Sequence, residues 1–247
     1  MDARRLSWAG IELRVGEARL LIDPLVWVDP LQDFLGRPRF ALVPVEPDPD
    51  TWVLVTHLHP DHADRAFLRR VTPGRVLCHH PAAESLGAEG VVTSPLALWQ
   101  TAQLGPFLVT PVPAHDWRGD DQVSWIVESG GRRIIHCGDT IWHGRWHEIA
   151  TRYGPFDAAF LPINGVIARL PGRIPHEIPA TLPPEAAIEA AVVLEARLAC
   201  AIHHTLFDNP PGYVEQPCAI SRFLTAASRR GVRAVATPEG EKISWPD

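Results

Sequence analysis

A short segment rich in metal-binding side chains follows an apolar run near the start of the chain. Residues 56–62 read Thr-His-Leu-His-Pro-Asp-His, and they come directly after the run Trp-Val-Leu-Val of residues 52–55. Neutral imidazoles and carboxylates are ligands that borderline divalent cations such as zinc prefer. The segment therefore constrains the fold, because a strand must end here and its turn must direct these side chains toward shared points.

The spacing within the segment predicts two cations rather than one. His57 and His59 are two residues apart and can face the same way, while Asp61 and His62 follow round the turn toward a second point. One cation needs three or four ligands, so later parts of the chain must complete both positions. The alternative is a surface loop that happens to be rich in histidine, which is less favoured because histidine is a rare residue.

Composition excludes several classes of protein. The net charge is -6 over 247 residues, without a block of lysine or arginine, whereas nucleic-acid binders usually carry a basic stripe. No apolar run approaches the roughly 20 residues of a membrane-spanning helix, and the N-terminus lacks a signal-peptide core. Four scattered cysteines form no CxxC pair, so neither a disulfide framework nor a thiolate site is expected. We expect a cytoplasmic protein.

Hydrophobic patterns predict one domain over residues 1–247, with strands first and then strands alternating with helices. We expect loops over 29–50 and 165–184. The predicted strands cover 11–15, 19–22, 52–56, 75–78, 90–93, 107–111, 123–128, 133–137, 158–161, 198–202 and 232–236. The predicted helices cover 63–70, 82–86, 146–153, 184–196 and part of 214–230.

Three of the later predicted strands end at side chains that suit a cation: His115, Asp139 and His203. Taken singly, each histidine could be an ordinary loop residue, and the aspartate could cap a turn. Taken with residues 57–62, they complete two coordination shells. His204 competes with His203, but adjacent side chains of a strand point opposite ways, and His203 is favoured.

The order of these residues resembles the metallo-β-lactamase superfamily: HxHxDH, then a histidine, then Gly-Asp-Thr, then a histidine. Residues 20–24, 160–163 and 182–187 resemble its branch of ascorbate-phosphate lactonases and N-acyl-phosphatidylethanolamine phospholipase D-like hydrolases. The resemblance implies an α/β (α+β) fold, a four-layer αββα sandwich. It also implies two divalent metal ions, zinc by default, with manganese or iron accepted by the same ligands.

The resemblance assigns the ligands residue by residue. It implies one cation on His57, His59 and His115, a second on Asp61, His62 and His203, and Asp139 as the bridge. Asp61 would also be catalytic, orienting a hydroxide formed from a shared water whose pKa the cations lower to about 7. Asp23 and Asp64 are candidates for hydrogen-bonding support.

The substrate pocket is where the chain departs from the family pattern. Asn164 stands where the family often has glycine, and residues 204–207 read His-Thr-Leu-Phe instead of a Trp-Gly-Thr-Phe-like run. Asn164, His176 and His204 are therefore the expected substrate-binding residues.

These features predict a metal-dependent hydrolase of a small ester, lactone or phosphodiester, acting on a small molecule and compatible with a homo-oligomer. A glyoxalase II-like thioesterase is less favoured, because few residues remain after His203 for the helical region of that group. The alternative from another class is a non-enzymatic metal-binding sensor on the same fold.

Overall fold

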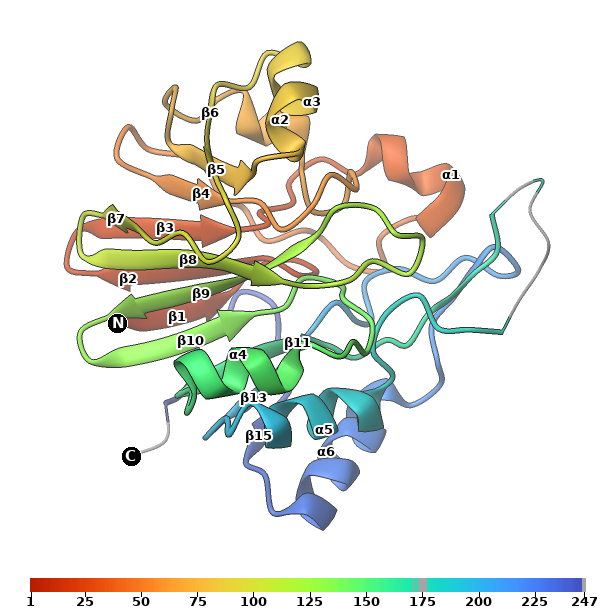
Figure 1. The fold of residues 1–247 in the computed structure, drawn as a ribbon. Helices are drawn as coiled ribbons and strands as arrows, with labels where there is room; N and C mark the ends of the chain where they lie inside the picture. Colours follow the sequence, from red (N-terminus) through yellow and green to blue (C-terminus); the bar gives the residue numbers. More distant parts are fainter. Residues whose placement is uncertain (171, 173–176, 246–247) are drawn as a thin grey trace.

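Two β-sheets lie face to face at the centre of the protein, with helices on the outer side of each (Figure 1). The computed structural model describes residues 1–170, 172 and 177–245. In Figure 1, α2 and α3 cover one sheet and α4, α5 and α6 cover the other. The predicted αββα arrangement is thereby confirmed.

The first sheet has six strands in chain order. They are β1 (Asp2–Arg5), β2 (Ile11–Val15), β3 (Ala18–Ile22), β4 (Trp52–Leu54), β5 (Val76–His79) and β6 (Thr93–Leu96). The first three are antiparallel, and β3 to β6 run parallel. Parallel neighbours need crossovers, and these contain η1 (Asp29–Leu31), α1 (Gln32–Leu35), α2 (Arg65–Leu68) and α3 (Ala82–Ala88). The parallel strands consequently end at the same edge.

The second sheet has seven strands in the order β15-β13-β11-β10-β9-β8-β7. They are β7 (Ala102–Leu104), β8 (Phe107–Pro113), β9 (Val123–Ser129), β10 (Arg132–His136), β11 (Ala158–Pro162), β13 (Ala199–Ile202) and β15 (Ala234–Val235). Its helices are α4 (Trp146–Tyr153), α5 (Pro184–Val193) and α6 (Ala219–Arg230). A separate two-stranded sheet pairs β12 (Ile167–Ala168) with β14 (Tyr213–Val214).

The apolar core between the sheets is continuous with the edge that carries the His-rich segment. Trp125 of β9 is fully buried, and its Nε1 donates a hydrogen bond to the carbonyl of Val55 at 3.0 Å. The backbone N–H of Val123 donates to the carbonyl of Thr56, also at 3.0 Å. These bonds fix the end of β4 against the opposite sheet, so both sheets contribute to one site.

Most predicted elements are confirmed, and the differences have physical reasons. The helix at residues 146–153 has the predicted bounds, whereas the expected loop at 29–50 contains α1, a single turn ended by Gly36 at φ +88°. Strand β1 was not predicted because its sequence is polar, yet Arg5 is buried against the C-terminal segment and donates to the Thr237 carbonyl.

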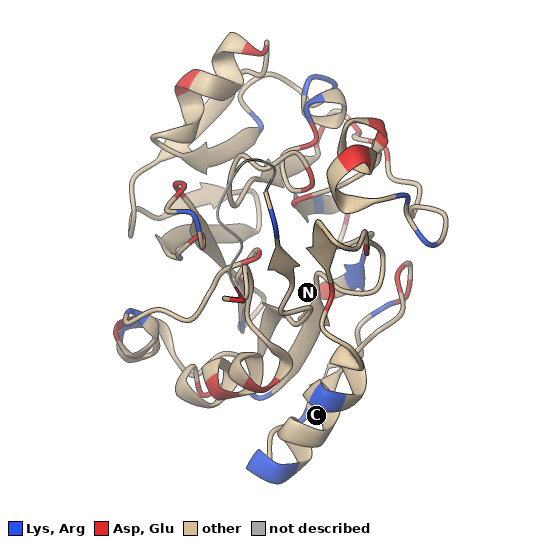
Figure 2. Ribbon diagram, turned by 90° about the vertical axis from the view of Figure 1, so that its right-hand side faces the viewer, with Lys and Arg blue, Asp and Glu red and all other residues tan. Residues whose placement is uncertain are grey.

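The outer layers carry mixed charge. Figure 2 shows Lys and Arg interspersed with Asp and Glu on the helices of both layers. Within the described residues, no helix is long and apolar enough to cross a membrane.

A glycine at the edge provides a test of how tightly the sheets meet. Gly138 has φ +61°, and a Cβ there would lie 3.0 Å from Thr56 Oγ1 and 3.0 Å from Gln122 Nε2. We expect Gly138→Ala to lower the free energy of unfolding by about 1–2 kcal/mol, because alanine is strained in the left-handed backbone conformation. The close contacts of the added Cβ with Thr56 and Gln122 should lower it further. Gly144→Ala, where a Cβ meets nothing within 4 Å, is the matched control. Equal urea midpoints for the two variants would contradict the prediction.

Candidate metal centre

Three strand ends bring six of the predicted ligands to one edge of the sandwich. The His-rich segment follows β4, Asp139 follows β10, and His203 follows β13. Six of the seven predicted ligands meet in two groups of three, in which the ligand atoms lie within 4.8 Å of one another. One group is His57, His59 and Asp139, and the other is Asp61, His62 and His203.

Asp139 lies between the groups. Its Oδ1 is 3.5 Å from His57 Nε2, and its Oδ2 is 3.9 Å from both His59 Nδ1 and His62 Nε2. These separations exceed hydrogen-bond length. Two atoms bound to one zinc at about 2.1 Å in tetrahedral geometry are about 3.4 Å apart, so the spacing suits atoms that share a cation.

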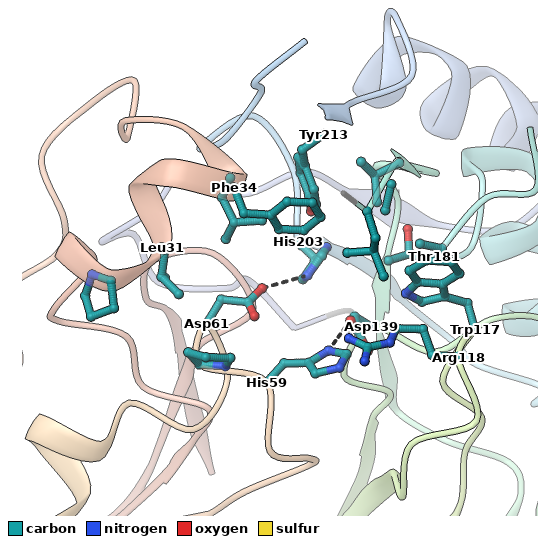
Figure 3. A pocket seen from close by; sticks show the side chains of 17 residues that line it. Leu31, Phe34, His59, Asp61, Trp117, Arg118, Asp139, Thr181, His203 and Tyr213 are labelled. Carbon is teal, nitrogen blue, oxygen red and sulfur yellow. Dashed lines mark ion pairs between the residues drawn. The ribbon is translucent and has the colours of Figure 1, made fainter. Parts of the chain in front are cut away.

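The second group has the same spacing. Asp61 Oδ2 is 3.6 Å from His62 Nε2 and 3.6 Å from His203 Nε2. In Figure 3, Asp61 points toward His203 and His59 points toward Asp139, with the two pairs side by side below the pocket.

Several of these atoms are buried without a hydrogen-bond partner among the described residues. They are the Nε2 atoms of His57, His62 and His203, and Asp139 Oδ1. Buried polar atoms are nearly always bonded, and leaving one unsatisfied costs about 1–3 kcal/mol. Two divalent cations, one at each group, would satisfy all four atoms, so the donor set fits metal ions.

Asp23 orients two of the motif histidines from beneath. This carboxylate is fully buried and accepts hydrogen bonds from the N–H and O–H of Thr56, at 2.9 and 2.6 Å. It also lies 2.8 Å from His62 Nδ1, while Thr56 Oγ1 lies 3.0 Å from His57 Nδ1. With Nδ1 held on both rings, each Nε2 faces the cation position, which is how supporting groups usually fix a metal-binding histidine.

Asp64 supports the fold rather than a histidine. Its carboxylate accepts the N–H of Phe67 at the start of α2 and the N–H groups of Val26 and Trp27. It thereby caps the helix and anchors the loop after β3.

In His59, unlike in His57 and His62, it is Nε2 rather than Nδ1 that lies beside supporting groups. Asp120 Oδ2 lies 3.1 Å from this nitrogen, and Asp116 Oδ2 lies 3.9 Å from it. Asp116 is buried, and its Oδ1 accepts the N–H of Arg118 at 2.6 Å, whereas its Oδ2 has no hydrogen-bond partner among the described residues. With Nε2 facing these carboxylates, His59 presents Nδ1 to Asp139.

The structure does not bring His115 into either group. Its side chain is exposed, and its ring lies 5.1 Å from that of His143. Its backbone is fixed by Thr140, whose Oγ1 accepts the His115 N–H at 3.0 Å. The neighbouring Asp116, which the sequence did not single out, is the residue that lies beside His59 Nε2.

The centre carries surplus negative charge. Burial alone would lower the pKa of His62, but Asp61, Asp23 and Asp139 outweigh it and raise that pKa to about 9. Burial is likewise outweighed at His59, whose pKa is raised to about 10, mainly by Asp139. Such a cluster attracts cations, and binding a metal there must displace protons.

Trp8 contacts the group of Asp61, His62 and His203, although it lies far from all three in the sequence. It lies in the turn between β1 and β2 at φ +59°, and its Nε1 donates to Asp61 Oδ2 at 2.9 Å. Its ring centroid is 4.0 Å from that of His203, and its carbonyl accepts the His203 N–H at 3.0 Å. Trp8 therefore fixes two of the three residues of this group.

A cavity of about 220 Å³ opens above the two groups. Its polar residues include Asp61, Asp139 and His203 at the floor and Thr181 and Tyr213 in the wall (Figure 3). Its apolar wall consists of Pro30, Leu31, Phe34, Leu35, Pro60, Trp117, Val166, Ala168, Leu170 and Ala180.

Two of the three predicted substrate-binding residues, Asn164 and His204, do not line the cavity. Asn164 is fully buried behind the wall, where its Nδ2 donates to the Tyr213 hydroxyl oxygen at 3.1 Å. His204 is buried and lies outside both ligand groups, in contrast to His203. His176 lies outside the described residues.

Comparison with known proteins identifies relatives. Residues 19–204 match the family described as Beta-lactamase superfamily domain. A protein named UPF0173 metal-dependent hydrolase, from Thermococcus onnurineus, is 30% identical over 174 residues, which are 67% of this chain and 73% of that protein. A protein of the same UPF0173 name from Symbiobacterium thermophilum is 31% identical over 144 residues, 57% of this chain and 60% of that protein.

Solved structures share the fold at low identity. An isothiocyanate hydrolase from Delia radicum gut bacteria has a TM-score of 0.73 at 17% identity, covering 99% of both chains. The diiron β-hydroxylase CmlA from Streptomyces venezuelae has a TM-score of 0.70 at 16% identity, covering 98% of this chain and 54% of that one. Because such different reactions occur on one fold, the reaction must be argued from the site.

The hydrogen bond from Trp8 can be tested by a conservative substitution. Trp8→Phe keeps a ring against His203 but removes the N–H that holds Asp61. We expect metal affinity to fall about 10- to 100-fold, as for other supporting groups. Trp27→Phe, at an exposed tryptophan, is the control. Chelator competition measures the affinity, and an unchanged value for Trp8→Phe would contradict the assigned role.

The contrast between neighbours 115 and 116 gives a second test. We expect Asp116→Ala to weaken metal binding about 10- to 100-fold, because it removes the buried carboxylate beside His59. His115→Ala should leave the affinity unchanged, because that side chain is exposed. Metal content after dialysis against a chelator separates the two variants, and the reverse order would show that His115 is the ligand.

Proposed function

The chain belongs to the beta-lactamase superfamily, and on that premise we propose that it is a metal-dependent hydrolase of small esters or lactones. The observation that carries the proposal is the pair of three-residue ligand groups that meet at Asp139 beneath an apolar pocket. A shared carboxylate supports two adjacent cations. The name of the UPF0173 relatives, metal-dependent hydrolase, agrees with this activity.

We assign one cation to His57, His59 and Asp139, and the other to Asp61, His62 and His203, with Asp139 shared. When bound, the cations would supply Lewis acidity that makes hydroxide available from water near neutral pH and polarises the substrate. Zinc is the default, and manganese or iron suits the same ligands.

The chain's own residues would do the positioning. Asp61, held through Oδ2 by Trp8, would orient the attacking water. Asp23 and Thr56 would keep the histidine rings from rotating, so that the ligand positions are set before the substrate arrives.

The pocket wall favours an ester or lactone over a phosphodiester. Leu31, Phe34 and Val166 are among the apolar side chains beside the ligand groups, and they suit a hydrocarbon group. Arg118 also lines the pocket, but its Nε is 3.7 Å from Asp120 Oδ2 and its charge is partly compensated.

Metal removal and a substrate panel test the function. We expect chelation to abolish hydrolysis of an uncharged aryl ester and a lactone, and zinc or manganese to restore it. Asp139→Ala should lower kcat by at least about 100-fold, because the shared ligand is lost. A thioester and a phosphodiester serve as comparison substrates. Faster turnover of the thioester would favour a thioesterase, and about two metals per chain with no turnover of any probe would favour a sensor.

A further inference from the structure

The hydroxyl of Tyr213 is one of the few polar groups in the mainly apolar wall of the pocket. Tyr213 lies in β14, whose pairing with Ala168 of β12 fixes its backbone. The residue is only 4% exposed and lines the same cavity as Asp61 and Asp139. In Figure 3 it lies above His203, on the pocket side of the ligand groups.

Two hydrogen bonds determine in which direction the O–H of Tyr213 can point. Thr181 Oγ1 donates to Asn164 Oδ1 at 2.5 Å, which fixes the amide so that its Nδ2 faces Tyr213. That Nδ2 donates to the phenol oxygen at 3.1 Å. A phenol has one proton and can accept as well as donate, so with its oxygen accepting from Asn164, its own O–H is available to a ligand in the pocket.

The phenol is also kept protonated. Burial, together with the negative charges of Asp61 and Asp139, raises the pKa of Tyr213 well above its ordinary value. A phenol is protonated near neutral pH at its ordinary pKa of about 10, and this environment favours the same form, so the side chain can donate a hydrogen bond there.

We propose that Tyr213 is a catalytic residue, whose O–H binds the carbonyl oxygen of a small, uncharged acyl substrate with an apolar acyl group. This rests on the proposed hydrolase function and names its substrate class. The apolar wall, which includes Phe34 at 5.7 Å between ring centroids from Tyr213, receives the hydrocarbon part. Asn164, which the sequence placed in the pocket, is a positioning residue that acts through Tyr213.

The role of the donor follows from the charge that develops during ester hydrolysis. Water adds to the carbonyl carbon, a C–O bond forms, and the carbonyl π pair moves onto its oxygen. When the carbonyl re-forms, the bond to the alkoxide breaks, and the proton that the water loses ends on the alcohol. Tyr213 keeps its proton throughout and stabilises the negative oxygen by a hydrogen bond.

Kinetics of a conservative variant test the assignment. Tyr213→Phe should lower kcat for an uncharged aryl ester about 100-fold, with KM raised by no more than about tenfold and metal content unchanged. Tyr153→Phe, in α4, is the matched control. Wild-type kcat in Tyr213→Phe, or loss of metal from it, would overturn the assignment.

A binding measurement separates this inference from the hydrolase proposal. Acetophenone and ethylbenzene have similar shapes, but only the ketone has an oxygen acceptor, and neither is an ester. Metal-free wild-type protein should bind acetophenone about three- to tenfold more tightly, and Tyr213→Phe should remove that preference. If Tyr213→Phe keeps the preference for acetophenone, Tyr213 is not the donor. This conclusion does not depend on which substrates the protein hydrolyses.

The positioning role of Asn164 is tested through Thr181. Thr181→Val removes the hydroxyl that orients the amide, and it should lower kcat in the wild-type background but not in Tyr213→Phe. Thr181→Ser, which keeps a hydroxyl, should restore the rate. Equal losses in both backgrounds would mean that Thr181 acts independently of Tyr213.

Discussion

The buried carboxylate of Asp23 is the interaction on which the site depends. It lies at the end of β3 at φ +46°, fully enclosed, and no arginine or lysine pairs with it among the described contacts. Its hydrogen bonds to Thr56 and His62 offset the cost of burying the charge. The end of β3 is thereby fixed to the turn after β4, and the ligand histidines are oriented by the same bonds.

The second sheet contributes the residue that lies between the two ligand groups. Gly138 allows the chain to approach Thr56 closely, and this places Asp139 between the two groups. Trp8 links the centre to the C-terminal part of the chain. Its backbone N–H donates to Glu239 Oε1, its indole N–H donates to Asp61, and its ring packs against His203. Elements that are distant in sequence thus position the ligand groups together. A change in how the two sheets pack would therefore alter the distances between the ligand atoms.

The layers of the site have separate chemical roles. On the proposed function, the two ligand groups would hold the cations that activate water. On the same proposal, the wall above them would select the substrate, and there Tyr213, held by Asn164 and Thr181, lines a cavity together with side chains such as Leu31. Several wall residues, such as Phe34, Ala168 and Tyr213, come from α1, β12 and β14 rather than from the ends of the main strands, so they can vary without changing a ligand.

The sequence by itself determined most of the strands and the turn that carries the His-rich segment, because strand periodicity and the spacing from His57 to His62 are local properties, and the sandwich followed from the family resemblance that those residues carry. It also favoured His203 over His204, since neighbouring side chains diverge. Only the tertiary structure decided that Asp116 rather than His115 lies beside His59, that Trp8 contacts Asp61 and His203, and that Tyr213 lines the cavity above them. Beyond the last paired residue of a strand, the direction of a side chain depends on backbone angles and packing partners far along the chain, and no local pattern encodes these.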